Sequence, residues 1–390
     1  MARQPQTFRD KYGIAVHTSH RVVAIMPSEQ QVVVDDLDGG GERRESYDRL
    51  LIACGALPVR PALEGIDSDG IHQVNSFSGG LRLRELLDRH SPQRAVVVGG
   101  GYIGVEMAEA LHQRGLPVTL VQRPGQLMST LDAEMAEAFA EYLTRAGVKL
   151  RLGEAVQGFT SHNGQVSGVV TDQGSIAGDL VILGLGVTPN SALARAAGIP
   201  LGVRDSIRVN QRQETETANI WAAGDCAESS HLISGGAVHL ALGTVANKQG
   251  RVAGINLADG EASFPGVLGT AITKFMEGEC SRSGLSEREL QELGWEYVTA
   301  TVDGHTLPRY YPGSAPIRVK VLAAKGTGRL LGVQIVGGPG SAKRIDTAAV
   351  ALQAGLTLEQ LLYLDLSYAP PFSGVWDPLV IAARLALKEA

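Results

Sequence analysis

The sequence predicts an α/β protein, with a nucleotide-binding domain built on a parallel sheet and a separate α+β domain after it. The first observation is a strand–helix progression. The apolar strand "RAVVVGG" leads through a glycine turn to a helix at Ile103–Arg114, and "PVTLVQR" forms the next strand. An amphipathic helix at Asp132–Ala146 and the strand "VKLRLG" continue the βαβαβ pattern that is typical of a parallel sheet. The second observation is that, from about Phe264 onward, strands such as "RVKVLAA" and "LLGVQIVGG" alternate with helices at Ala342–Ala354 and Leu358–Leu364.

The remaining segments have weaker but consistent patterns. The stretches "RVVAIM" and "QVVVDDL" alternate and are rich in β-branched residues, which predicts an antiparallel meander followed by a buried strand at Leu50–Cys54. A short helix is expected at Leu81–Arg89, and the hairpin-like "VSGVVTDQGS" and the strand "DLVILGLG" close the nucleotide-binding domain. After Pro189 the pattern changes, with a short strand in "IWAAGDCAE" (Ile220–Glu228) and a helix at Ala241–Leu257.

Composition limits the classes of function. The chain has 390 residues, enough for two to four domains, and its 44% hydrophobic and 19% charged residues are typical of a globular protein. The net charge is −6 and no basic stretch stands out, so neither nucleic acid nor an anionic membrane is an expected partner. Apolar runs are too short for a membrane span, and the first residues do not resemble a signal peptide, so a cytoplasmic location is expected.

The motif Gly99-x-Gly101-x-x-Gly104 is the main chemical signal in the sequence. The first glycine allows a tight turn, the second lets the backbone approach a pyrophosphate, and the third lets helix and strand pack closely. The start of the following helix then offers free N–H groups and a partial positive charge to the anion. This pattern predicts dinucleotide binding, and the alternative is a purely structural glycine turn.

The residues that end the next strand bear on the choice of cofactor. An acidic residue there would accept hydrogen bonds from a ribose, whereas a nearby arginine suits a 2′-phosphate. This chain has Gln122 followed by Arg123, which favours NADPH. The alternative is that Arg123 simply lies in solvent.

The stretch "AAGDCAE" places Asp225 behind Gly224 at the end of a strand. Such an aspartate can accept hydrogen bonds from ligand hydroxyls, although by itself the pattern is more typical of a helix or turn cap.

Metal and cysteine chemistry find little support in the sequence. The three cysteines form no C-x-x-C pair and have no zinc-site spacing, so no metal is predicted. His17 and His20 are three residues apart in an expected strand, which would put them on opposite faces. Neither a His-Glu-x-x-His nor a Gly-x-Ser-x-Gly motif is present.

Several motifs together give the chain a family resemblance. The segments "YDRLLIACGALPVRPALEGI", "RAVVVGGGYIGVEMAEAL", "GLGVTPN", "IWAAGDCAE", "NKQGRVAG", "YYPGSAP", "KRID" and "YAPPFSGVWDP" occur in this order. Their order resembles that of the flavin-dependent pyridine nucleotide–disulfide oxidoreductases. The branch with coenzyme A–disulfide reductases, NADH oxidases and persulfide reductases is the most similar. The resemblance extends from about Phe8 to about Asp377.

The resemblance implies two Rossmann-like nucleotide-binding domains, the FAD-binding one incomplete, and a C-terminal α+β dimerisation domain. The implied domains are residues 1–78 and 198–263 for FAD, 79–197 for NAD(P), and 264–390 for the interface of a homodimer. It also implies cofactor-binding residues. FAD would contact Cys54, Gly55, Gly224, Asp225, Leu242, Gly243 and Thr244, and NAD(P)H would contact Gly99, Gly101, Tyr102, Gly104, Gln122, Arg123 and Gly186.

The resemblance further implies catalytic and substrate-binding residues. Tyr102 would act as a gate over the flavin, and Glu106 would lie near the site of hydride transfer. Tyr310 and Tyr368 would border the substrate site, together with Lys343 and Arg344. The substrate would be a small disulfide or a coenzyme A derivative. Each tyrosine could instead be an aromatic filler at an interface.

Family members begin with a βαβ unit that has its own glycine turn, followed by a redox cysteine. The sequence resembles the family only after both, so the chain is interpreted as N-terminally truncated, with the redox cysteine absent. The strand "RLLIAC" would then be an edge without a neighbour. Cys54, which replaces the threonine usual in this turn, is expected to be a small buried residue.

The predicted function is an FAD-dependent NAD(P)H oxidoreductase that passes a hydride through flavin to a disulfide, a persulfide or oxygen. The alternative is a catalytically inactive remnant that binds a nicotinamide nucleotide, or an interaction module.

Overall fold

The structure is a computed structural model that describes residues 4–390. The chain forms two compact units. The first unit comprises the chain up to Leu57 with Thr188–Ser230 and Gly236–Gly266. The second comprises Pro58–Val187, His231–Gly235 and Val267–Ala390. The chain passes between them within β5 (Ala56–Pro58) and β14 (Val187–Pro189), on either side of His231–Gly235, and after Gly266. None of the described helices is long and apolar enough to cross a membrane.

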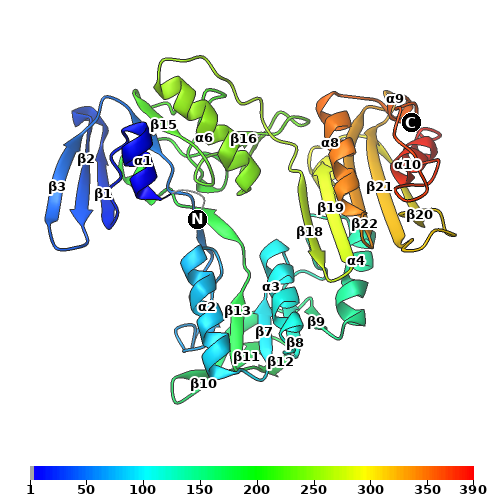
Figure 1. Cartoon of the computed structure of the whole chain (residues 1–390), viewed down its shortest axis with the longest axis horizontal. Helices are drawn as coiled ribbons and strands as arrows, with labels where there is room; N and C mark the ends of the chain where they lie inside the picture. The colour runs from blue at the N-terminus through cyan, green and yellow to red at the C-terminus, as the bar shows by residue number, and fades with distance from the viewer. Residues whose placement is uncertain (1–3) are drawn as a thin grey trace. The chain divides into compact units, whose positions relative to one another are not determined.

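The first unit begins with helix α1 (Pro5–Tyr12) and the antiparallel meander predicted from the sequence (Figure 1). Its strands are β1 (His20–Met26), β2 (Gln31–Asp36) and β3 (Gly41–Ser46), with the short helix η1 (Pro27–Glu29) between the first two. Alternate residues of β2, Val32 and Val34, are buried, while β3 is mostly exposed. The period of two in burial is what the alternating sequence predicts.

The strand predicted as an unpaired edge has a neighbour. Strand β4 (Leu50–Ile52) pairs in parallel with β15 (Ile220–Ala222), with Ile52 opposite Ala222. The prediction was wrong because pairing partners far apart in the sequence are not visible in a local pattern. The rest of this unit contains one long helix, α6, and several short elements. They are α5 (Ala192–Ala196), η2 (Val203–Asp205), β16 (Ser229–Ser230), β17 (Ala237–Val238) and α6 (Gly243–Leu257).

The second unit contains the predicted parallel sheet, in the order β6-β13-β7-β8-β9. Its strands are β6 (Ile71–His72), β7 (Ala95–Val98), β8 (Val118–Gln122), β9 (Lys149–Leu152) and β13 (Leu180–Leu183). All four residues of β7 are buried, as expected for a strand covered on both faces. The helices are α2 (Phe77–His90), α3 (Tyr102–Gln113) and α4 (Ala133–Arg145). The hairpin strands β10 (Val156–His162), β11 (Gln165–Thr171) and β12 (Gly174–Ala177) form a separate sheet.

The C-terminal part of this unit is an antiparallel sheet in the order β18-β19-β22-β21-β20. Its strands are β18 (Ala271–Phe275), β19 (Gly278–Gly284), β20 (Tyr297–His305), β21 (Pro316–Ala324) and β22 (Leu330–Gly337). The helices are α7 (Glu287–Glu292), η3 (Ala342–Arg344), α8 (Ile345–Gln353), α9 (Leu358–Leu362) and α10 (Pro378–Ala386). Helix α10 was not predicted from the sequence.

The antiparallel sheet is covered on both faces. Ile335 lies in a core with residues of α8 and α10, whereas its neighbour Val336 lies in a second core with residues of α3 and α4. Because adjacent strand residues point to opposite faces, α3 and α4 pack on one face and the C-terminal helices α8 and α10 on the other. Every residue of β22 is buried as a result.

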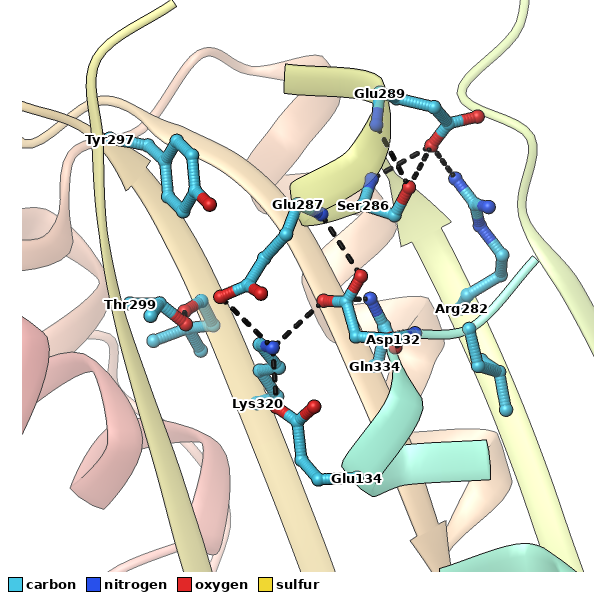
Figure 2. Close-up of polar contacts among 12 residues, drawn as sticks. Asp132, Glu134, Arg282, Ser286, Glu287, Glu289, Tyr297, Thr299, Lys320 and Gln334 are labelled. Atoms are coloured by element: carbon cyan, nitrogen blue, oxygen red, sulfur yellow. Dashed lines mark hydrogen bonds and ion pairs between the residues drawn. The ribbon is translucent and has the colours of Figure 1, made fainter. Parts of the chain in front are cut away.

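A buried ion cluster joins α4 to this sheet (Figure 2). Lys320 on β21 is 1% exposed and its Nζ lies 2.9 Å from Asp132 and 3.1 Å from Glu287, with Glu134 also paired. Asp132, just before α4, accepts from the Gln334 side chain at 2.8 Å and from the Glu287 amide at 3.0 Å. Burial alone would lower the pKa of Lys320, but hydrogen bonds to Glu134 and Asp132 raise it above its ordinary value.

Candidate nucleotide-binding sites

The glycine motif forms a tight turn between β7 and α3. Gly99 has φ +108°, and a Cβ on it would lie 2.4 Å from the Gly184 carbonyl oxygen. A Cβ on Gly104 would lie 1.8 Å from the Gly99 carbonyl oxygen. Both positions therefore require glycine in this backbone, the first for its φ and both for close packing.

Gly101 differs from these two glycines because it faces open space. A Cβ there would meet no described atom within 4 Å. Gly101 is the N-cap of α3, and no side chain among the described residues caps the helix. The Gly101 carbonyl accepts the first helical hydrogen bond, from the Val105 amide at 3.0 Å. The amides of the residues before Val105 therefore have no acceptor within the helix and point out of its start. An open turn with free amides fits the pyrophosphate of a dinucleotide.

The end of β8 is directly linked to this turn. The Gln122 side-chain oxygen accepts a hydrogen bond from the Gly100 amide at 2.8 Å, which leaves the amide nitrogen of Gln122 as a donor. Arg123 is exposed beside it. Gly186, with φ +82°, is also exposed in the segment after β13. The structure thus brings these predicted residues to the carboxyl edge of the parallel sheet, where ligands of such sheets bind.

Tyr102 and Glu106 lie in the first turns of α3. Burial raises the pKa of Tyr102, whose hydroxyl lies by Thr130. The Glu106 carboxylate is exposed and accepts a hydrogen bond from the Thr273 hydroxyl at 3.1 Å. Thr273 is on β18, and sequence reasoning missed it because no local motif marks a partner 167 residues away.

The residues predicted to contact FAD all lie in the first unit. Gly55 and Gly224 follow the paired strands β4 and β15, with φ +68° and +83°. Asp225 has a buried carboxylate oxygen without a hydrogen-bond partner among the described residues. A buried oxygen of this kind fits a ligand hydroxyl, because an unsatisfied polar group is costly.

The start of α6 provides a second anion-binding position in this unit. Leu242 is its N-cap, and no side chain in the described part of the chain caps it. Gly243 and Thr244 are exposed there. A free helix start in the same unit as Asp225 fits the phosphate and hydroxyl groups of a flavin nucleotide.

Cys54 is exposed, so the prediction that it is a small buried residue was wrong. It lies two residues beyond the end of β4, and its thiol donates to the Asn190 carbonyl at 3.1 Å. Cys226 is buried, and its sulfur lies 3.4 Å from the Ala223 carbonyl oxygen and 3.5 Å from that of Ile52. Cys280 is buried in the second unit, and burial raises its pKa to about 12.

The four residues predicted at a substrate site lie on or near the exposed surface of the C-terminal sheet and its loops. Tyr310 and Tyr368 are 76% and 48% exposed. Lys343 is exposed and paired with Asp346. The Arg344 guanidinium instead lies 3.0 Å from Asp377 and donates to the carbonyls of Gly340, Thr306 and Phe372, so it stabilises the loop that ends at α10.

The two N-terminal histidines lie side by side, contrary to the prediction that they point to opposite faces. Their ring centroids are 5.4 Å apart. His17 precedes β1, which begins at His20, so the alternation of a strand does not apply to the pair. Across residues 4–390, no group of three or more metal-binding side chains was found.

Comparison with known proteins identifies the family. Residues 2–250 match the profile described as pyridine nucleotide-disulphide oxidoreductase, and residues 270–379 match the dimerisation domain of the same family. The chain belongs to this family. Its members' FAD and NAD(P)H fit the two sites described above, and the chain is accordingly an FAD-dependent NAD(P)H oxidoreductase with a dimerisation domain.

Individual relatives cover nearly the whole chain. An NAD(P)H coenzyme A polysulfide/persulfide reductase of Pyrococcus horikoshii is 40% identical over 382 residues, which are 98% of this chain and 84% of the relative. The solved structure of an NAD-dependent persulfide reductase from A. fulgidus has 36% identity and a TM-score of 0.95, covering 99% of this chain and 71% of that one.

A third similar structure is an engineered water-forming NADPH oxidase, bound to NADPH and derived from the Lactobacillus brevis NADH oxidase. It has 28% identity and a TM-score of 0.89, covering 95% of this chain and 82% of that one. Its five substitutions include an aspartate changed to alanine and the residue directly after it changed to arginine.

Proposed function

We propose that this oxidoreductase takes electrons from NADPH and delivers them, through FAD, to a coenzyme A-linked disulfide or persulfide. Hydride transfer from nicotinamide to flavin is the chemistry that these cofactors supply when bound. The chain supplies binding and orientation. The uncapped amides before Val105 would hold the nicotinamide nucleotide, while Asp225 and the start of α6 would hold the flavin nucleotide. The single observation that best supports the proposal is the open, uncapped glycine turn at Gly101.

The remaining site residues have proposed roles. Tyr102 would act as the gate at the flavin, and Glu106, held by Thr273, would lie near the transferred hydride. Tyr310 and Tyr368 would border the substrate with Lys343, while Arg344 would act by holding their loop. A cytoplasmic location stays a prediction.

The experiment for the electron acceptor uses the full chain supplied with FAD. NADPH oxidation is followed without oxygen, first alone and then with coenzyme A disulfide or coenzyme A persulfide. We expect oxidation that depends on one of the sulfur substrates. Oxidation that occurs only with oxygen would indicate an oxidase instead, and no oxidation with any acceptor would contradict the proposal.

The preference for NADPH is proposed from the end of β8. The side-chain oxygen of Gln122 accepts a hydrogen bond from the Gly100 amide, so only its NH₂ group would be available to a ribose. An NH₂ group donates hydrogen bonds, whereas a carboxylate in this place would accept them. Arg123 adds a positive charge next to Gln122. In the engineered NADPH oxidase, an introduced arginine likewise directly follows a residue whose acidic side chain has been removed. Charge-assisted hydrogen bonds between arginine and phosphate are among the strong ones in proteins.

Replacing Arg123 with alanine is expected to weaken NADPH binding by about ten- to hundredfold and to leave NADH binding nearly unchanged, the equivalent of one hydrogen bond to a charged group. Titrations with both nucleotides measure the ratio of dissociation constants. Lys149→Ala is the matched control, because Lys149 is an exposed cation at the opposite, amino end of β9. An unchanged ratio in Arg123→Ala would show that this side chain does not bind the 2′-phosphate.

We propose that the chain forms a homodimer through the C-terminal part of the second unit. Large apolar side chains are exposed there, with Tyr363, Tyr310 and Phe372 at 78%, 76% and 75%. Val375 and Trp376, which follow Phe372 closely in the sequence, are 70% and 51% exposed. Exposed apolar groups of this size are typical of an interface with another protein. A second copy of the chain is the expected partner, given the dimerisation domain.

The double substitution Phe372→Glu with Val375→Glu is expected to convert the dimer to a monomer, because each dimer would bury four added carboxylates. Sedimentation velocity measures whether each variant is a monomer or a dimer. Leu293→Glu, at a 43% exposed residue after α7, serves as the control and should leave the dimer intact. A dimer that persists in the double variant would place the interface elsewhere.

A further inference from the structure

The segment between β8 and α4, residues 123–131, connects the end of the nucleotide-binding strand to the next helix, and we call it the β8–α4 loop. Its residues Leu127, Met128 and Leu131 are buried. Met128 has φ +45°, a left-handed conformation that a residue other than glycine adopts only where its surroundings hold it. The contacts of the β8–α4 loop therefore fix one particular backbone path.

One part of the β8–α4 loop is bonded to the glycine turn. The Met128 amide donates to the Gly100 carbonyl at 2.8 Å, and the Gly100 amide donates to the Gln122 side chain at 2.8 Å. The Leu127 side chain packs against the turn as well, because a Cβ on Gly100 would lie 2.5 Å from its Cδ2 atom. Since Gly100 directly precedes Gly101, the path of the loop helps to set the direction of the amides at the start of α3.

Another part of the loop is bonded to the antiparallel sheet by Arg282 of β19. The Arg282 side chain is buried and donates through Nη1 to the Thr130 carbonyl at 2.6 Å. Its Nη2 donates to the Gly284 carbonyl at 2.5 Å and lies 2.7 Å from Glu289 (Figure 2). Gly284 and Glu289 thus orient the guanidinium within the sheet, and Thr130 is the part of the loop that it holds.

The sheet itself does not depend on the bond to Thr130. Strand β19 is paired on both sides, with β18 and with β22. What the bond orders is the loop, because a hydrogen bond from a charged donor to a buried carbonyl is among the strong ones in proteins. Arg282, Thr130 and Gly100 all belong to the second unit, so a continuous set of contacts leads from the sheet to the glycine turn.

We propose that Arg282 is a positioning residue for the nicotinamide nucleotide. Through Thr130 and the β8–α4 loop, it holds the glycine turn in the shape that binds pyrophosphate. This inference rests on the proposed function, which places the nucleotide at that turn. The pyrophosphate is common to NADPH and NADH, so Arg282 supports the binding of both. Arg123, by contrast, is proposed to act on the 2′-phosphate of NADPH alone.

The first experiment needs no nucleotide. Hydrogen–deuterium exchange compares the full wild-type chain with Arg282→Met, since methionine fills part of the same volume but donates no hydrogen bond. We expect the amides of residues 99–101 and 123–131 to exchange at least about threefold faster in the variant, because local opening becomes easier. Unchanged exchange in both segments would overturn the proposal.

The second experiment titrates the full chain with NADPH and with NADH. Arg282→Met is expected to weaken the binding of both nucleotides by about tenfold. Glu289→Gln is the matched control, because it removes the charge of the same ion pair but leaves the bond to Thr130. Glutamine can also keep the capping box with Ser286. The affinities of Glu289→Gln should equal those of the wild type.

Three results of the titrations would overturn the proposal. They are unchanged affinities in Arg282→Met, an equal loss in Glu289→Gln, and a loss for NADPH alone. A wild type that binds neither nucleotide would contradict the proposed function, and the exchange rates would still decide whether Arg282 holds the turn. If Arg282→Met fails to fold, Arg282→Lys takes its place. Lysine keeps the charge beside Glu289 but lacks the planar fork that also reaches Thr130.

Discussion

Replacing Lys320 with methionine is expected to lower the free energy of unfolding by about 3–5 kcal/mol. The ammonium group is almost completely buried and is paired with Asp132, Glu134 and Glu287 (Figure 2). The Glu134 and Glu287 side chains are 41% and 29% exposed and can turn to water, but that of Asp132 is 5% exposed. Removing the cation therefore leaves the buried Asp132 carboxylate without a counter-charge, and such an unpaired buried charge strongly destabilises the folded state.

Urea denaturation followed by circular dichroism measures this loss, with Lys325→Met as the control. Lys325 is an exposed lysine directly after the same strand, so its replacement should change stability by about 0.5 kcal/mol or less. Adding Asp132→Asn to Lys320→Met should recover part of the loss, because the charge left unpaired is then absent. If Lys320→Met and Lys325→Met had equal free energies of unfolding, the ion cluster would make no net contribution to stability.

The same cluster should make stability depend on pH. Burial would raise the pKa of Glu134, but its hydrogen bond to Lys320 lowers it below the ordinary 4.5. The contribution of Glu134 to the free energy of unfolding is therefore fully present above pH 4.5. It is lost as the pH falls through the lower pKa that Glu134 has in the folded protein. Lys320 has a raised pKa, so its contribution is lost only as the pH rises above 10.5. In Lys320→Met the loss of unfolding free energy at acid pH should be smaller than in the wild type, because Glu134 no longer has the partner that lowers its pKa.

Gly101→Val is expected to weaken NADPH binding by about a hundredfold or more while leaving the fold intact. A Cβ at Gly101 meets no described atom within 4 Å, and its φ of −85° suits any residue, so the apo protein accommodates valine. The added side chain would instead occupy the space into which the α3 amides point. Losing about two hydrogen bonds to a charged phosphate corresponds to at least this factor.

Fluorescence titration with NADPH measures the affinity, and thermal unfolding tests the fold. Gly80→Val is the matched control, because Gly80 in α2 also has open space at its Cβ and belongs to the same unit. Its affinity should equal that of the wild type. If Gly101→Val bound NADPH normally with an unchanged melting temperature, the pyrophosphate would have to bind elsewhere.

Local sequence patterns predicted most of the elements correctly. The glycine turn, the helix after it and the strand ending at Gln122 lie within one or two residues of their predicted positions, because apolar periodicity and glycine placement act over a few residues. The missed helix α10 lies in the apolar "PLVIAARLA", where there is little polar alternation to mark a helix face.

Contacts between distant segments could be predicted only in part. Cys54 and Cys226 lie shortly after the ends of β4 and β15, but placing them near the same sheet edge required knowing that those strands are parallel neighbours. Nothing local marks Lys320, which looks like an ordinary polar residue in the alternating strand "RVKVLAA". Its three carboxylate partners come from α4, from α7 and from the residue just before α4.

The sequence by itself determined the strand, glycine turn and helix around Gly99–Gly104 and membership of a flavoprotein family, since these depend on short-range spacing. Only the tertiary structure decided that Cys54 is exposed while Cys226 is buried, that β4 has a partner and that Lys320 pairs with three carboxylates. Burial and charge pairing depend on which segments meet in space, and segments more than 150 residues apart meet only once the sheets have formed.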